Sequence, residues 1–434
     1  MRILIAAIGT HGDVHPYVAL AQGFQSAGYA VAICTHVTHR QFVETHGIPF
    51  APLAGDVRAL LASENGRQLL TQRNPLVAVR QLHALAAPLL KQVMVDIIEA
   101  AAGADLILAS TLAYPNAVTA SHVHRIPLML AGLQPFTPTS AFPCVLLSPL
   151  RYPFPGRGTL YRFTHHAAYR LLQWTSARLV NQYRQALTGL PALRYLDVFG
   201  DLIAQRTPVL YGFSEHLLPR PVDYGPFVHL TGFWFLKEQC DWEPSPALVE
   251  FLRDGPPPVY AGFGSMSDRR PKETAQIVVE ALRRSGQRGI LATGWEGLRA
   301  ELSGPDIFLI DHVPHTWLFP RTALAVHHAG VGTVAAALQA GVPQVLIPFG
   351  VDQPFWAEMA HRRQVTPRPI PRNHLAVQRL AAAMMQALHE PVFRRRSEQV
   401  GAAIRSEDGV GAAVDVVRRF MAPQTTAVQP SSPA

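Results

Sequence analysis

The sequence predicts an α/β protein built from two domains with parallel sheets. Short apolar runs alternate with helix-prone stretches in both halves of the chain, which is typical of strand–helix–strand crossovers. Strands in each half lead into glycine-containing turns, at residues 9–16 and again at 328–333. The chain has 434 residues, enough for two domains of ordinary size.

The first half opens with the apolar run Ile3 to Ile8, which predicts a buried parallel strand. We expect a helix over 17–28 and further strands over 30–35 and 106–109. The first turn, GTHGDVHP, lacks the full GxGxxG fingerprint, and no acidic residue follows the second strand to hold a ribose. The sequence therefore argues against a nicotinamide-dependent dehydrogenase.

Composition shifts to proline and charge near residue 236, which predicts domains over 1–235 and 236–421. The second half repeats the strand–turn–helix pattern. Its expected strands are 258–262, 290–293, 307–310 and 323–327, and its expected helices are 271–284, 334–341, 375–389 and 393–421. Residues 422–434 are rich in Pro, Ser, Thr and Gln, so we expect a disordered tail.

The most informative segment reads VHHAGVGTVAAALQAGVPQVLIPFGVDQPFWAE, from Val326 to Glu358. It combines a strand, a glycine-rich turn and a helix start, where unpaired N–H groups and the positive end of the helix dipole favour an anion. Asp352 and Gln353 follow the next apolar run. Because ligands bind beyond the carboxyl ends of parallel strands, this pair and His328 are expected to face one crevice. A diphosphate on the turn and hydroxyl groups on the acid–amide pair together indicate a nucleotide sugar.

The ordered string HHAGVGT, AGVP and DQPFW resembles the donor-binding signature of family 1 UDP-sugar glycosyltransferases. The wording, with GFWFL, VYAGFGSM and PFTPTSAFP elsewhere, is most similar to the sterol 3β-glucosyltransferase branch and its bacterial relatives that glycosylate antibiotics and lipids. This resemblance implies the GT-B fold, in which two Rossmann-like domains face each other across a cleft. It also implies that the last helix crosses back onto the N-terminal domain, and that the N-terminal domain binds the acceptor.

The resemblance assigns roles to residues of both halves. Aligned by Gly12 and Pro16, the catalytic base falls on Asp13. The donor set is Ser265, His328, Gly330, Gly332 and Thr333 at the diphosphate, His312 and Val313 at the base, and Asp352 and Gln353 at the sugar. His312 stands where plant relatives carry Trp, which leaves the strength of base stacking open.

Three residues of this set have a structural alternative. His328 could be only a satisfied core histidine. Asp13 could be only a helix N-cap, a position that Asp favours. Ser265 could be a plain turn serine. His11 and His15 have the i, i+4 spacing of a metal pair, but no third ligand is evident, so we expect no metal and no other cofactor.

The predicted reaction is inverting, metal-independent transfer of a hexose, glucose from UDP-glucose, to a hydroxyl of an apolar acceptor such as a sterol, a polyketide or a lipid. A UDP-sugar 2-epimerase and a catalytically inactive GT-B auxiliary subunit remain alternatives. Residue types leave the acceptor, the choice between glucose and a deoxysugar, and the oligomeric state open.

The formal net charge is +8, carried almost wholly by arginine, yet no nucleic-acid-binding module is recognisable. No apolar run reaches transmembrane length, and the N-terminus does not read as a signal peptide, so we expect a cytoplasmic protein. The stretch 159–190 interleaves arginines with aromatic residues. It predicts either peripheral contact with anionic membrane or an ordinary core-and-solvent helix.

Overall fold

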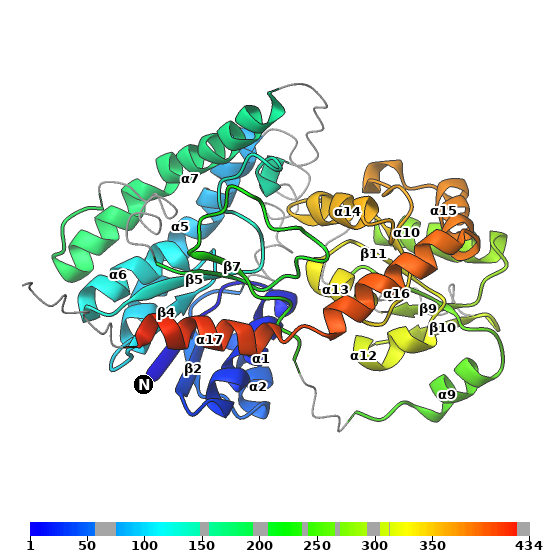
Figure 1. The fold of residues 1–434 in the computed structure, drawn as a ribbon, viewed down its shortest axis with the longest axis horizontal. Coiled ribbons are helices and arrows are strands. Elements are labelled where there is room, and N and C mark those ends of the chain that lie inside the picture. Colours follow the sequence, from blue (N-terminus) through cyan, green and yellow to red (C-terminus); the bar gives the residue numbers. More distant parts are fainter. Residues whose placement is uncertain are drawn as a thin grey trace, which may run out of the picture.

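The computed structural model describes residues 1–56, 75–147, 156–193, 207–236, 242–264, 270–292, 304–311 and 313–422. Two separate parallel sheets organise these residues, each covered by helices (Figure 1). The predicted donor residues Ser265 and His312 lie outside the described residues, as do residues 423–434 of the predicted tail. We call the part around the first sheet the N-terminal half and the part around the second sheet the C-terminal half.

The first sheet has seven strands in the order β3-β2-β1-β4-β5-β6-β7, all parallel. The strands are β1 (Arg2–Ala6), β2 (Ala30–His36), β3 (Phe50–Leu53), β4 (Leu106–Ala109), β5 (Leu128–Gly132), β6 (Val209–Tyr211) and β7 (Val228–Leu230). Its helices include α1 (His11–Ser26), α2 (Arg40–Thr45), α5 (Pro75–Ala100), α6 (Tyr114–His124) and α7 (Arg157–Thr188). Every residue of β4 is buried, which explains its continuous apolar sequence.

The second sheet has five parallel strands in the order β10-β9-β8-β11-β12. They are β8 (Val259–Gly262), β9 (Gly289–Ala292), β10 (Ile307–Ile310), β11 (Leu324–His327) and β12 (Gln344–Leu346). The helices here include α9 (Pro246–Arg253), α10 (Pro271–Arg284), α12 (His315–Leu318), α13 (Val331–Gln339), α14 (Gln353–Arg362), α15 (Val377–His389) and α16 (Pro391–Arg405). The predicted fold class, two parallel-sheet α/β halves, is confirmed.

The last helix, α17 (Gly409–Met421), leaves the C-terminal half and packs along the N-terminal half beside α1 (Figure 1). Val414, Val416 and Val417 on its inner face are buried. At Gly23 of α1 an added Cβ would lie 2.1 Å from Cγ1 of Val410, so the two helices approach closely there. The predicted crossing of the C-terminal helix back onto the N-terminal half is confirmed.

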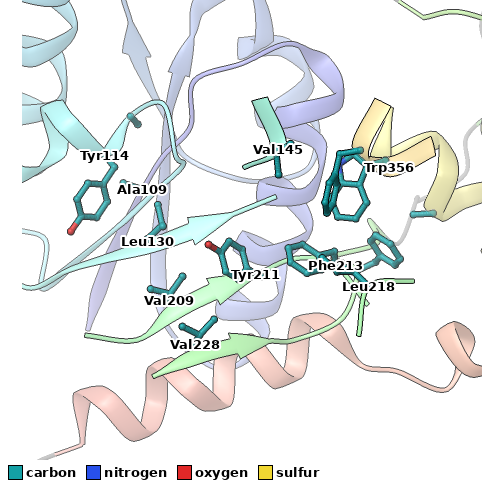
Figure 2. Packing of buried hydrophobic residues seen from close by; sticks show 14 of the residues in the cluster. Ala109, Tyr114, Leu130, Val145, Val209, Tyr211, Phe213, Leu218, Val228 and Trp356 are labelled. Carbon is teal, nitrogen blue, oxygen red and sulfur yellow. The ribbon is translucent and has the colours of Figure 1, made fainter. Parts of the chain in front are cut away.

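Helix α14 joins the two halves through buried aromatic side chains. The ring centroid of Trp356 lies 5.4 Å from that of Phe213, and that of Phe355 lies 5.1 Å from that of Phe142. Figure 2 shows Phe213, which follows β6, beside Trp356 of α14. Beyond the helix, Arg363 donates hydrogen bonds to the carbonyl oxygens of Leu217 and Glu215. One hydrophobic cluster therefore extends from the first sheet into the C-terminal half.

Several helix bounds differ from the predictions. The predicted helix 393–421 is two helices, α16 and α17, because the Asp408 side chain caps a new helix start by accepting from the N–H of Gly411. Helix α1 begins at His11 rather than Tyr17 and contains Pro16, because Thr10 and Asp13 form a capping box that stabilises an earlier start. Helix α13 begins at Val331 rather than Val334. Its first turn is closed by hydrogen bonds from the N–H groups of Thr333 and Val334 to the carbonyl of Gly330.

Helix α7 occupies the predicted basic and aromatic stretch, but part of its basic face points inward. Arg184 is 2% exposed and donates hydrogen bonds to the Pro191 carbonyl and to Nδ1 of His122. Tyr161 is also buried, whereas Phe163 is 64% exposed. This pattern is that of a helix with a packed face and a solvent face. No helix among the described residues is both long enough and apolar enough to span a membrane.

Candidate functional site

The predicted site residues follow the central strands of both sheets. In the first sheet β1 lies between β2 and β4, and in the second sheet β8 lies between β9 and β11. These are the places where the chain order along each sheet reverses, and ligands of open α/β sheets bind beyond the carboxyl ends of such strands. Asp13 follows β1, whereas His328 follows β11.

Asp13 is the third residue of α1, and the N-cap is Thr10. The alternative interpretation of Asp13 as the N-cap is therefore wrong. Its Oδ2 accepts hydrogen bonds from the backbone N–H of Thr10 at 2.8 Å and from the Thr10 hydroxyl at 2.9 Å. Burial raises the pKa of the Asp13 carboxyl, while these hydrogen bonds and nearby His39 lower it. The capping contacts use one carboxylate oxygen, which makes helix capping compatible with a second role for the other oxygen.

His328 lies between two glycines. An added Cβ on Gly330 would be 2.6 Å from Nε2 of His328, and one on Gly264 would be 3.2 Å from Cε1. Gly264 also has φ +60°, a backbone conformation that favours glycine. Both positions therefore have to be glycine if the imidazole is to keep its place.

The surroundings of His328 favour its neutral form. Burial, and secondly the charge of His315, lower the pKa of His328 to about 4. The unliganded imidazole is therefore neutral near pH 7, and in this form it can still donate one N–H. Its Nδ1 is buried and has no hydrogen-bond partner in the described part of the chain. Such an unsatisfied buried nitrogen is the kind of group that a bound ligand can satisfy.

His327, one residue earlier, has a structural role. It is fully buried, its Nε2 lies 2.9 Å from Oε1 of Gln344, and its Nδ1 accepts a hydrogen bond from the N–H of Ala329. This pairing links the ends of β11 and β12.

The glycine turn prepares the start of α13. Ala329 has φ +67°, which is uncommon for a residue with a side chain, and Gly330 is the N-cap with extended backbone. Gly332 and Thr333 lie in the first turn of the helix, and an added Cβ on Gly332 would meet nothing within 4 Å. The N–H groups at the start of this helix that precede Thr333, and the open space at Gly332, suit an anion.

Asp352 and Gln353 form the N-terminus of α14, after a second left-handed residue, Val351, at φ +57°. Oε1 of Gln353 accepts hydrogen bonds from the N–H groups of Phe349 and Gly350, which hold this side chain against the preceding loop. Asp352 is half-buried at the interface between the halves. Burial, and secondly the charge of Asp13, raise the pKa of Asp352 to about 6.

Val313 is 7% exposed and belongs to a hydrophobic cluster with Tyr260, Leu318 and Phe319. Its side chain is part of the core, which leaves only its backbone for the predicted contact with the base. Of the predicted set, the structure brings Asp13 and Asp352 together across the halves. His328 and the α13 start form a second group on the C-terminal half.

Four residues near the site were not assigned a role from the sequence. Gln134 follows β5 and donates from Nε2 to Oδ2 of Asp352 at 3.4 Å, and Trp356 donates from Nε1 to the same oxygen at 3.2 Å. His39 lowers the pKa of Asp13, and His315 lowers that of His328. The position of Gln134 directly after a strand was a usable signal, as was the spacing of Trp356 one helical turn after Asp352. The effects of His39 and His315 depend on contacts that are more distant in sequence.

The PFTPTSAFP loop is packed through its polar groups. Thr137 interacts with the buried hydroxyl of Tyr211, its N–H and Oγ1 each lying 2.8 Å away. Thr139 and Ser140 donate to the carboxylate of Asp223. This loop carries Phe142 against Phe355 of α14, so it helps to fix the contact between the halves.

Within the described residues, no group of three or more His, Cys, Asp or Glu side chains is arranged to hold a metal ion. His11 and His15 instead belong to an aromatic cluster, with ring centroids 4.6 Å and 5.0 Å from that of Phe42.

Comparison with known proteins decides the family. A model described as the glycosyltransferase family 28 N-terminal domain matches residues 3–143, and one described as the erythromycin biosynthesis protein CIII-like C-terminal domain matches residues 296–417. A sterol 3-beta-glucosyltransferase of Arabidopsis thaliana is 33% identical over 444 residues, covering 100% of this chain and 70% of that protein. The chain belongs to this family of UDP-sugar glycosyltransferases.

Other relatives of this glycosyltransferase are longer proteins. A second Arabidopsis thaliana sterol 3-beta-glucosyltransferase is 36% identical, with 95% of this chain and 64% of that protein covered. A sterol 3-beta-glucosyltransferase of Cryptococcus neoformans is 32% identical over 96% of this chain, which spans 27% of the fungal protein.

Solved structures show that this glycosyltransferase has the GT-B fold. The glycotransferase of kitacinnamycin has a TM-score of 0.69 at 19% identity, covering 96% of this chain and 98% of the other. The glycosyltransferase VinC, solved in complex with DTDP, has a TM-score of 0.67 at 19% identity, covering 96% and 99%. Because both structures are only 19% identical in sequence to this chain, the similarity is one of fold alone.

Proposed function

We propose that this glycosyltransferase transfers glucose from UDP-glucose to the hydroxyl of a sterol-like acceptor, with inversion at the anomeric carbon and without a metal ion. The observation that carries the proposal is the electrostatic effect of Asp13 on Asp352 across the two halves. The C-terminal half also carries a glycine turn suited to a diphosphate. The relatives named as sterol 3-beta-glucosyltransferases support the choice of sugar and acceptor class.

Asp13 is the proposed general base. It removes the proton of the acceptor hydroxyl as that oxygen attacks the anomeric carbon, while the bond from the sugar to UDP breaks. Thr10 holds one carboxylate oxygen, which orients the other. The base belongs to the N-terminal half and the diphosphate turn to the C-terminal half, which supports attack from the face opposite the leaving group.

The leaving UDP gains negative charge, and the proposed stabilising groups are His328 and the N–H groups of Gly330 and Gly332. Such preorganised donors are effective because they need no reorganisation as charge develops. Thr333 keeps its predicted place in the donor set, with its N–H already bonded to the carbonyl of Gly330. Ser265 and His312 keep their predicted roles at the phosphates and at the base, as proposals for residues outside the described part of the chain. In this proposal the donors replace a metal ion, so activity is expected to survive EDTA.

Asp352 and Gln353 are the proposed partners of the sugar hydroxyls. Oε1 of Gln353 accepts from the backbone of the loop, which fixes this side chain at the start of α14, where the resemblance places the sugar. Asp352 accepts from hydroxyls when ionised, which its pKa of about 6 allows at neutral pH. Fixing the sugar in this way orients the anomeric carbon for attack.

The test is a product assay with purified protein, UDP-glucose and a panel of a sterol, a macrolide, a flavonoid and a hydroxy-lipid, with and without EDTA. We expect a sterol glucoside with inverted anomeric configuration, formed in the same amount with and without EDTA. A product formed only from another acceptor would show that the sterol assignment is wrong. Retention of the anomeric configuration would refute a single displacement with Asp13 as the general base.

A cytoplasmic location and peripheral contact with anionic membrane also remain proposals. Co-sedimentation with anionic vesicles tests the membrane contact.

A further inference from the structure

The Asp352 carboxylate is held from one side. The amide of Gln134 and the indole of Trp356 both donate to Oδ2, at 3.4 Å and 3.2 Å. Among the described residues, Oδ1 receives no hydrogen bond from a side chain. One oxygen is therefore used for positioning, and the other is left for a ligand.

Both donors depend on the N-terminal half. Gln134 belongs to it directly, in the loop after β5, where the neighbouring Thr137 is tied to the buried Tyr211. Trp356 belongs to α14, but its ring packs against Phe213 after β6. The orientation of a carboxylate in the C-terminal half is thus determined by groups anchored in the other half.

We propose that Gln134 is a positioning residue for the donor sugar: by holding Oδ2 of Asp352 it aims Oδ1 at a sugar hydroxyl only when the two halves are together. The proposal rests on the proposed function, since it takes Asp352 as a partner of the sugar. It makes recognition of the sugar, but not of the nucleotide, depend on a residue of the acceptor half.

The charges around Asp352 give this proposal a pH signature. Within the described residues, the ionisable group that acts on it from another element is Asp13 of α1, whose negative charge disfavours ionisation. The N–H groups of Gln134 and Trp356 favour ionisation and so lower the pKa of Asp352. Removing the Gln134 amide therefore raises that pKa and leaves more of the carboxyl protonated at pH 6.

The experiment uses the full chain with Gln134→Leu and Gln134→Glu, and with Gln25→Leu as the matched control. Gln25 is at the far end of α1, where its amide donates only to the Gly47 carbonyl. Kd values for UDP and UDP-glucose are measured by calorimetry from pH 6 to pH 8, together with kcat and KM for glucosyl transfer. Melting temperatures verify that each variant is folded.

For Gln134→Leu we expect the Kd and KM of UDP-glucose to rise about tenfold at pH 6, as for a lost hydrogen bond to a charged group, with UDP binding within about twofold of wild type. The defect shrinks toward pH 8, where Asp352 is ionised in both proteins. For Gln134→Glu the defect grows toward pH 8, because two ionised carboxylates repel, whereas a shared proton keeps the contact at pH 6. A merely structural role does not produce opposite pH trends.

Three results would overturn the proposal: UDP-glucose binding that is unchanged in Gln134→Leu, equal losses for UDP and UDP-glucose, or defects that do not vary with pH. Failure of the proposed function looks different. A wild-type protein that binds UDP-glucose but forms no sterol glucoside refutes the acceptor assignment alone, whereas one that does not bind UDP-glucose refutes both proposals.

Discussion

Asp13 and Asp352 are electrostatically coupled although they belong to different sheets. Burial, and secondly the charge of Asp13, raise the pKa of Asp352 to about 6, and burial also raises the pKa of Asp13. Two neighbouring carboxylates destabilise each other's ionised forms. The protein tolerates this cost where a base and a sugar-binding acceptor are both proposed to act.

Asp13→Asn is expected to lower kcat by about 10²- to 10⁴-fold, since an amide cannot take the acceptor proton. The amide oxygen can still accept from the N–H of Thr10, so α1 keeps its cap and the melting temperature is expected to stay within about 2 °C. Product formation and UDP affinity are measured together. Near-normal turnover would reduce Asp13 to a capping residue.

Asp352→Asn is expected to make the protein more stable at pH 8 but not at pH 4. The folded protein binds the Asp352 proton more tightly than the unfolded chain does, because its folded pKa is raised from 3.8 to about 6. Stability is therefore lost as pH rises from about 4 to about 6, and the loss persists above that window. Melting temperatures across this range check the sign, with exposed Asp254→Asn as control. An equal shift at both ends would contradict the assignment.

UDP binding is expected to take up a proton at His328. The pKa of about 4 follows mainly from burial, and a diphosphate placed against the imidazole raises it by favouring the charged form. UDP affinity therefore increases as pH falls from 8 to 6. Calorimetry in two buffers with different ionisation enthalpies measures the uptake. The His328→Gln variant is expected to lose the part of the proton uptake that is due to His328. Its affinity for UDP is expected to be roughly tenfold weaker. Unchanged uptake in the variant would exclude His328 as the proton acceptor.

Gly330→Ala is expected to weaken the binding of UDP about as much as loss of the imidazole does, although this substitution removes no polar group. The new Cβ would come within 2.6 Å of Nε2 of His328, so the ring has to move. Gly304→Ala is the matched control, because nothing lies within 4 Å of an added Cβ there. Titration with UDP separates the two variants. Equal affinities would show that the position of the ring is unimportant.

Gly23→Ala is expected to lower the melting temperature even though alanine favours helix by about 1 kcal/mol. Its Cβ would lie 2.1 Å from Cγ1 of Val410, which forces α17 away from α1. Shortening the opposing side chain in Gly23→Ala with Val410→Ala should restore much of the loss, as a double-mutant cycle can measure. Additive effects would mean that the two helices do not meet at this point.

The elements with continuous apolar sequences were predictable. Strands Leu106–Ala109 and Ile307–Ile310 have the predicted bounds, because an apolar run with clear turn signals specifies its own ends. The predicted start of α1 was wrong, because a capping box between Thr10 and Asp13 stabilises an earlier start although Pro16 lies inside the helix. Local rules compete at such a place, and their balance is difficult to read from the sequence.

By itself the sequence determined the two-sheet α/β class, the glycine turn with His328, and the acid–amide pair Asp352 and Gln353, because each of these is a local pattern along the chain. The tertiary structure alone decided that Gln134 holds Asp352, that Asp13 raises its pKa, and that His328 is neutral. The first two properties arise from contacts between residues far apart in the chain, and they exist only when α14 packs against the N-terminal half. The third follows mainly from burial.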